Sequence, residues 1–177
     1  MSTVETQQVA IPTGTWKIDP SHSRVEFSIR HLGIASIHGS FADFDGVIDG
    51  DEPSISGAIR VASVDTRDEA RDGHLQSPDF FDAERHPEIT FASTRFEAGK
   101  VIGDLTLRGV TREVELAATV TGAGTDPWGN ERLGLELDGE IDRNDFGVSW
   151  NTPIPTGGLL LGDTVRLTAG FSAVKEA

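Results

Sequence analysis

The sequence predicts an all-β protein in which eight antiparallel strands close into a barrel with one helical insertion. Three features of the chain indicate this fold class. Apolar and polar residues alternate with a period of two, turn signals separate the alternating runs, and one segment carries helix signals. Alternate side chains of a strand share a face, so these runs have one apolar and one solvated face, as antiparallel sheets commonly do. A barrel is favoured over a sandwich because closure leaves no exposed edge strand.

The strands are expected where the alternation is regular. It is clearest at 25–30, where three apolar residues alternate with three polar ones, and it recurs at 114–120, 133–138 and 165–172. Turn residues such as Asp49-Gly50 separate the runs. Shorter runs predict the remaining strands, at 15–19, 39–49, 54–65, 88–97 and 100–108.

The helical insertion is expected from Thr66 to about Leu75. Thr66 and Glu69 have the spacing of a capping box, in which the hydroxyl bonds the amide of the fourth residue and the carboxylate reaches back. Ser77-Pro78 then has the pattern of an N-cap followed by proline at the first helical position. This pattern predicts a short turn through Phe80-Phe81.

The charge of the chain excludes several classes of partner. The 177 residues include 29 acidic and 15 basic ones, for a formal charge of −14. Nucleic-acid binding and adhesion to anionic lipid both need net Lys and Arg, so neither is expected. No run approaches the roughly 20 apolar residues of a membrane span, so no integral membrane segment is expected. Cysteine is absent, which excludes disulfides, thiol catalysis and cysteine-based zinc sites.

One domain is expected over residues 13–174, because no linker or shift of composition divides the chain. Residues 1–12 are expected to form a disordered N-terminal tail. They contain no basic region followed by an apolar stretch, so no signal peptide is visible and a cytoplasmic location is expected.

Six motifs follow one another along the chain: DPSHSRVEFSIRHLG at 19–33, GSFADFDG at 39–46, HLQSPDFFD at 74–82, PEITF at 87–91, GDLTLRGVT at 103–111 and RNDFG at 143–147. In this order they resemble the YceI-like, polyisoprenoid-binding family. The resemblance covers about 15–172, nearly the whole predicted domain.

This resemblance implies a lipocalin-like barrel that encloses an elongated apolar pocket. It implies binding of a long isoprenoid chain, as found in a polyprenol, a polyprenyl phosphate or an isoprenoid quinone. Members are often dimeric, so a homodimer is an expectation of the resemblance alone. No catalytic residue or cofactor is carried over. The chain departs from the family pattern in lacking a secretion signal and in having His86 where an aromatic residue often precedes Pro87.

The inward-facing apolar side chains have two interpretations. They either line a tunnel that holds a ligand or fill a solid core. The alternation alone favours a solid core, whereas the resemblance favours the tunnel. The residues concerned are Phe27, Ile29, Phe41, Ile89, Phe91, Leu105, Leu107, Leu116, Leu135 and Leu137.

Further candidates stand near the expected mouth of the barrel. Phe80 and Phe81 either gate this mouth or plug it. His31 is in phase with the inward face of its strand and is a candidate ligand contact or a hydrogen-bonded structural histidine. Arg143 is a candidate for binding a head group, with pairing to Asp145 as the alternative.

A basic face is expected on the helix. Arg67 and Arg71 stand four residues apart and His74 follows three later, so they share a helix face. A phosphate head group needs such a face. The alternative is pairing with the neighbouring carboxylates at 68, 69 and 72.

The resemblance to the YceI-like family, taken with these observations, implies a non-enzymatic binder or carrier of a long isoprenoid lipid. No catalytic or metal site is expected, because the five histidines contain no HxH, HxxxH or HExxH spacing and no GxSxG motif occurs. Two alternatives stay open: an enzyme acting on an apolar small molecule in the same pocket, with His31 as the residue to test, and a ligand-free, stress-related structural module with a solid barrel. The negative charge also predicts that a neutral head group binds more readily than a diphosphate.

Overall fold

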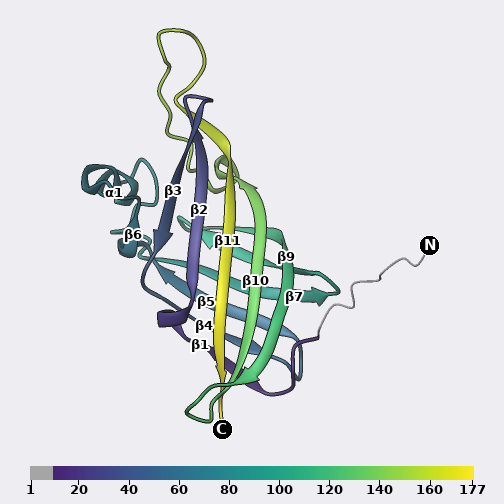
Figure 1. Ribbon diagram of the computed structural model, residues 1–177. Coiled ribbons are helices and arrows are strands. Elements are labelled where there is room, and N and C mark those ends of the chain that lie inside the picture. The colour runs from purple at the N-terminus through teal and green to yellow at the C-terminus, as the bar shows by residue number, and fades with distance from the viewer. Residues whose placement is uncertain (1–9) are drawn as a thin grey trace, which may run out of the picture.

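The structure is a computed structural model that describes residues 10–177 as a barrel of antiparallel strands (Figure 1). Residues 1–9 of the predicted tail lie outside the described residues. Ile11 is buried in the core, so the domain starts before the expected boundary at 13. The elements are β1 (Thr15–Ile18), η1 (Pro20–His22), β2 (Arg24–His31), β3 (Ala35–Phe41), β4 (Phe44–Asp49), β5 (Ser54–Arg60), η2 (Val61–Ser63), β6 (Val64–Asp65), α1 (Glu69–Gln76), β7 (Glu88–Glu97), β8 (Lys100–Leu107), β9 (Val110–Thr125), β10 (Glu131–Asp142), η3 (Arg143–Phe146) and β11 (Leu161–Lys175).

Eight strands of the described chain form a closed ring in the order β1-β4-β5-β7-β8-β9-β10-β11. The ring closes because β1 pairs with β4 on one edge and with the end of β11 on the other. In this closing pair Trp16 lies opposite Lys175, and Ile18 lies opposite Ala173. All these pairings are antiparallel, so the predicted eight-stranded antiparallel barrel with a helical insertion is confirmed.

The hairpin of β2 and β3 extends the sheet beside the ring. β11 is 15 residues long, and it pairs with β10 along one edge. Its other edge pairs first with β2, from Leu161 opposite His31 to Gly170 opposite Arg24 with a register shift between Leu161 and Val165, and then with β1. β6 joins the far edge of β3, and α1 contacts β6. The helix therefore stands to the side of this hairpin (Figure 1).

Two of the predicted strands are divided in the structure. The run 39–49 is broken at 42–43 into β3 and β4, and the run 54–65 contains η2 between β5 and β6. β3 pairs with β2, whereas β4 pairs with β1 and β5, so the chain must change partners between them. Local alternation carries no signal for a change of partner. Within residues 10–177, no helix combines the length and the apolar character needed to cross a membrane.

The helix begins later than expected. Asp68 is the N-cap of α1, and its Oδ1 accepts a hydrogen bond from the amide of Arg71 at 3.0 Å. The Thr66 hydroxyl donates instead to Asp72 at 2.6 Å. The predicted capping box of Thr66 and Glu69 is therefore wrong, while the end of the helix lies within a residue of the expected position.

Two clusters of buried apolar side chains form the core. The first surrounds the closure of the ring, and it includes Trp16, Ile18, Phe44, Ile48, Ile55, Val101, Leu133 and Leu135. The second includes Phe41, Val61, Val64, Phe80, Ile89, Leu107, Phe146 and Val148. Val25, Ile59 and Phe91 are only partly buried and pack against both clusters. The space between the two clusters is the interior of the barrel.

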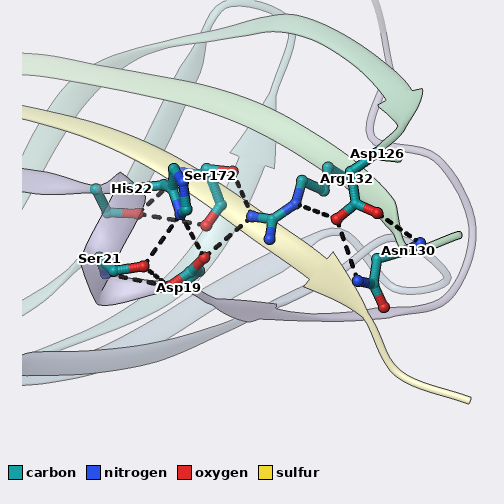
Figure 2. Close-up of polar contacts among 8 residues, drawn as sticks. Asp19, Ser21, His22, Asp126, Asn130, Arg132 and Ser172 are labelled. Carbon is teal, nitrogen blue, oxygen red and sulfur yellow. Dashed lines mark hydrogen bonds and ion pairs between the residues drawn. The ribbon is translucent and has the colours of Figure 1, made fainter. Parts of the chain in front are cut away.

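A polar cluster ties two turns to the start of β10 (Figure 2). The Arg132 guanidinium donates from Nη1 to Asp19 at 3.0 Å and from Nε to Asp126 at 2.9 Å. Hydrogen bonds from the Ser21 hydroxyl and from His22, together with Arg132, hold the pKa of Asp19 well below its ordinary value. Arg132 is the main cause of a similar lowering of the pKa of Asp126. These charged contacts join the η1 turn to the β9–β10 turn.

Candidate ligand-binding cavity

An elongated cavity of about 360 Å³ occupies the interior of the barrel. It extends from Ile18 and Ile55, which belong to the first core cluster, to His31, Trp150 and Leu160 at the other end. Ile18 and Ile55 are buried, whereas His31, Trp150 and Leu160 are each half-exposed. The wall is therefore partly accessible to solvent at the end formed by the last three residues, which is called the open end below. Its volume lies within the roughly 300–1,000 Å³ range of pockets that hold small ligands.

Fifteen of the sixteen candidate residues line this cavity. The exception is Leu135, which is 1% exposed and packs in the first core cluster. It faces inward as expected, but the side chains around the closing strand seal that level of the barrel. The solid-core interpretation is therefore wrong for most of the barrel. It is correct only at the level of Leu135. The residues on the wall are Phe27, Ile29, His31, Phe41, Arg71, His74, Phe80, Phe81, Ile89, Phe91, Leu105, Leu107, Leu116, Leu137 and Arg143.

The two phenylalanines after α1 are both packing residues and wall residues. Phe80 is 7% exposed, and its ring centroid lies 4.9 Å from that of His74 and 5.3 Å from that of Trp150. Phe81 is half-buried and meets Phe41 edge to face at 5.9 Å. Both rings line the cavity, so a role in closing the barrel end by packing and a role in gating its mouth do not exclude each other.

The basic face expected on the helix does not form. Arg67 precedes α1 with a positive φ of 65°, and it does not line the cavity. Arg71 donates from Nε to the hydroxyl of Thr66 at 2.8 Å and from Nη2 to the carbonyl of Thr66 at 2.6 Å. His74 Nε2 lies 2.9 Å from Oδ2 of Asp79. Arg71 and His74 therefore reach the cavity wall with these donors already bonded to the protein.

Arg143 is the charged side chain most deeply placed in the wall. It is 3% exposed, and its partners are three backbone carbonyls: Nε donates to Gly162 at 2.8 Å, and Nη1 donates to Val148 at 2.7 Å and to Trp150 at 2.8 Å. No hydrogen bond joins it to Asp145 in the described chain, so the expected alternative of that pairing is wrong. Burial lowers the pKa of Arg143 from its ordinary value.

One nitrogen of Arg143 remains uncommitted. Nη2 has no hydrogen-bond partner among the described residues. Every fully buried side-chain polar atom of the described chain has a partner, so Nη2 is not sealed inside the protein. Nη2 therefore keeps two N–H donors that make no hydrogen bond within the described chain, on a residue that lines the cavity.

Sequence reasoning missed other wall residues for two different reasons. Val165, Leu167 and Ala169 follow the period-two pattern of a predicted strand, so the signal was present. Trp150 and Leu160 lie in the irregular segment between η3 and β11, where no periodic pattern indicates which side chains face inward.

Asp19, Ser21 and His22 combine the residue types of a hydrolytic triad without its geometry. Ser21 Oγ and Asp19 Oδ2 lie 3.0 Å and 2.8 Å from the same ring nitrogen, Nδ1 of His22. A triad uses both ring nitrogens, one for the serine and one for the carboxylate. Within the described chain, no group of three or more His, Cys, Asp or Glu side chains could hold a metal ion.

Comparisons with known proteins agree with this architecture. A family model described as a YceI-like domain matches residues 16–173. A UPF0312 protein of Staphylococcus aureus (strain MSSA476) is 36% identical over 157 residues, which are 85% of this chain and 92% of the relative.

Solved structures share the fold. The YCEI protein of Campylobacter jejuni is 34% identical, with a TM-score of 0.72 over 84% of this chain and 91% of that one. BcnA of Burkholderia cenocepacia is 24% identical, with a TM-score of 0.73 over 88% and 98% of the two chains. A polyisoprenoid binding domain of Saccharophagus degradans is 14% identical, with a TM-score of 0.70 over 93% and 100%. At these identities the last two show similarity of fold alone.

Proposed function

The chain belongs to the YceI-like domain family, and from this premise we propose that it binds a long isoprenoid lipid in the barrel interior. The observation that carries the proposal is the elongated cavity, whose inner surface is almost entirely apolar although some polar residues take part in its wall. Burial of an apolar chain there contributes about 0.8 kcal/mol per CH₂ before the costs of association. The Saccharophagus degradans domain of the same fold, named for polyisoprenoid binding, supports the same ligand class.

The volume of the cavity suggests how much chain it holds. An apolar cavity of about 150 Å³ holds one benzene, which has six carbons. By this scale the 360 Å³ cavity holds roughly 14 carbons, or about three isoprene units. A longer chain then extends through the open end beside His31 and Leu160.

We propose that the polar end of the lipid accepts a hydrogen bond from Nη2 of Arg143. Two features support this role: Nη2 has no partner among the described residues, and Arg143 lines the cavity. One pair of N–H donors suits a compact acceptor such as a quinone carbonyl. A diphosphate needs further cationic donors, and those of Arg71 are largely taken by Thr66. Head-group contacts thus favour a neutral ligand, as the net charge does.

We further propose that the protein binds its ligand without transforming it. On the described cavity wall, no serine or threonine hydroxyl is hydrogen-bonded to a histidine, so no activated nucleophile faces the interior. The histidine nearest the core aromatic rings, His74, is committed to Asp79. A binding and carrying role requires neither a nucleophile nor a general base.

Ligand binding is tested by fluorescence quenching with decylubiquinone. Trp150 lines the cavity, so a bound quinone quenches its emission, and a saturable curve with a micromolar or tighter Kd is expected. Mild purification followed by mass spectrometry of an organic extract tests for a native lipid. Failure of both measurements, with no saturable quenching and no co-purified lipid, contradicts the proposal.

The head-group preference needs a separate comparison. Farnesol and farnesyl diphosphate share a chain of three isoprene units, so their difference in Kd reports the head group alone. We expect farnesol to bind at least as tightly as the diphosphate at low salt. Tighter binding of the diphosphate contradicts the assignment at Arg143 and leaves the binding of the chain itself intact.

A further inference from the structure

Three of the five large apolar side chains that are exposed in the described chain lie at one end of the molecule. Of the large apolar side chains in the described chain, Ile34 is 79% exposed, Leu159 57% and Leu32 39%. Leu32 and Ile34 belong to the turn between β2 and β3, and Leu159 belongs to the loop 151–160 that precedes β11. These three residues are called the apolar tip below.

The two segments of the apolar tip are held together. The amide of Leu32 donates to the carbonyl of Leu160 at 2.8 Å, and His31 pairs with Leu161 across the strands. Figure 1 shows the β2–β3 turn and the yellow-green loop before β11 projecting from the same end of the barrel. Leu32, Ile34 and Leu159 therefore form one surface built from two distant parts of the sequence.

The apolar tip is also where the negative charge of the protein is missing. The chain has 29 acidic residues, yet none lies between Glu26 and Asp43 and none between Asp145 and Asp163. The charged residue nearest the tip is a cation, Arg30, which donates to the carbonyl of Gly33 at 2.9 Å. An anionic protein can bring this end alone to a lipid surface without placing carboxylates against the head groups.

The apolar tip adjoins the open end of the cavity. His31 and Leu160 line the cavity, and they are the chain neighbours of Leu32 and Leu159. A surface that contacts the bilayer here places the opening beside the acyl chains. Contiguous exposed apolar side chains beside a binding site mark interaction surfaces for proteins or membranes.

We propose that the apolar tip inserts into the interface of a lipid bilayer and that the protein takes up or releases its ligand there. The apolar face of an interfacial amphipathic helix enters the boundary between head groups and acyl chains by about 5–10 Å, and we expect the tip to reach a similar depth. The proposed contact with the bilayer depends only on the observations of the apolar tip. The proposed exchange of ligand also rests on the function proposed above.

The test is co-sedimentation with sucrose-loaded phosphatidylcholine vesicles. We compare the wild-type protein with a double variant, Ile34→Glu and Leu159→Glu. Both side chains are exposed and neither lines the cavity, so the fold and ligand binding are expected to persist. Trp128→Glu is the matched control, because Trp128 is 82% exposed but stands in the β9–β10 turn beside Asp126.

We expect the double variant to bind vesicles at least about tenfold more weakly than the wild type, because two apolar side chains leave the interface. Trp128→Glu is expected to bind as the wild type does. Absence of wild-type binding, or an equal loss in the Trp128 control, overturns the proposal. Concentration-dependent self-association in sedimentation without vesicles, abolished in the double variant, also overturns it, because the tip is then a contact between copies of this chain.

Quinone titration of the same variants separates this proposal from the function. Unchanged decylubiquinone quenching in the double variant shows that the fold and the cavity are intact. If the wild type binds vesicles but no quinone, the proposed ligand is wrong and the bilayer contact stands. If the wild type binds quinone but no vesicles, the proposed bilayer contact is refuted and the proposed ligand class is retained.

Discussion

Replacement of Ala169 by phenylalanine fills the cavity from within and is the most direct test that the hollow interior holds the ligand. Ala169 lies on β11 and lines the cavity, with Leu137 on one neighbouring strand and Val25 on the other. Alternate residues of β11 share its orientation, so a larger side chain at this position points into the hollow rather than into solvent.

The magnitude follows from the volumes. A benzene ring occupies a cavity of about 150 Å³, so the new ring takes roughly two-fifths of the 360 Å³ available. It displaces about six carbons of ligand, close to one isoprene unit of five. For the five carbons of one isoprene unit, at about 0.8 kcal/mol per CH₂, the loss is about 4 kcal/mol, which corresponds to a roughly thousandfold weaker Kd.

The assay is quinone quenching of Trp150, with thermal unfolding as the check on folding. Ala117→Phe is the control, because Ala117 is exposed on the outer face of β9 and the substitution adds the same ring outside the barrel. We expect the control to bind as the wild type does. If Ala169→Phe unfolds at or above the wild-type temperature yet binds within about threefold of the wild type, the ligand does not occupy this cavity.

Three further predictions concern stability. Because the pKa values of Asp19 and Asp126 are lowered in the folded protein, their contribution is present above the ordinary value of 3.8 and is lost as the pH falls below it. Urea midpoints should therefore fall less steeply between about pH 5 and pH 2 in Arg132→Met than in the wild type, and equal slopes would contradict this account. Leu133→Ala, at a position 1% exposed, should cost about 2–5 kcal/mol of unfolding free energy in urea titrations; a cost below about 1 kcal/mol would mean that this level of the barrel is not packed. Arg143→Gln should cost about 2 kcal/mol or more, because buried carbonyls lose their donors, and wild-type stability would refute that role.

The strands and their inward faces could be predicted because they depend on local alternation. Phe27 and Ile29 follow a period of two and reach the cavity as expected. Leu135 follows the same period but is sealed by neighbours from the closing strands, which local sequence does not reveal. Thr66 has the spacing of an N-cap, yet Asp68 caps the helix. Thr and Asp are both good N-cap residues, so local sequence does not distinguish them, and the path of the chain before α1 determines which one caps it.

Strands with one apolar face can be read from the amino-acid sequence, because side-chain alternation is a property of each strand alone. The hollow interior is visible only in the folded barrel, because an empty space depends on side chains from opposite strands that do not meet. The role of Arg143 depends on the fold in the same way. Its carbonyl partner at Gly162 lies 19 residues further along the chain, and only the fold brings the two together and makes Arg143 part of the cavity wall.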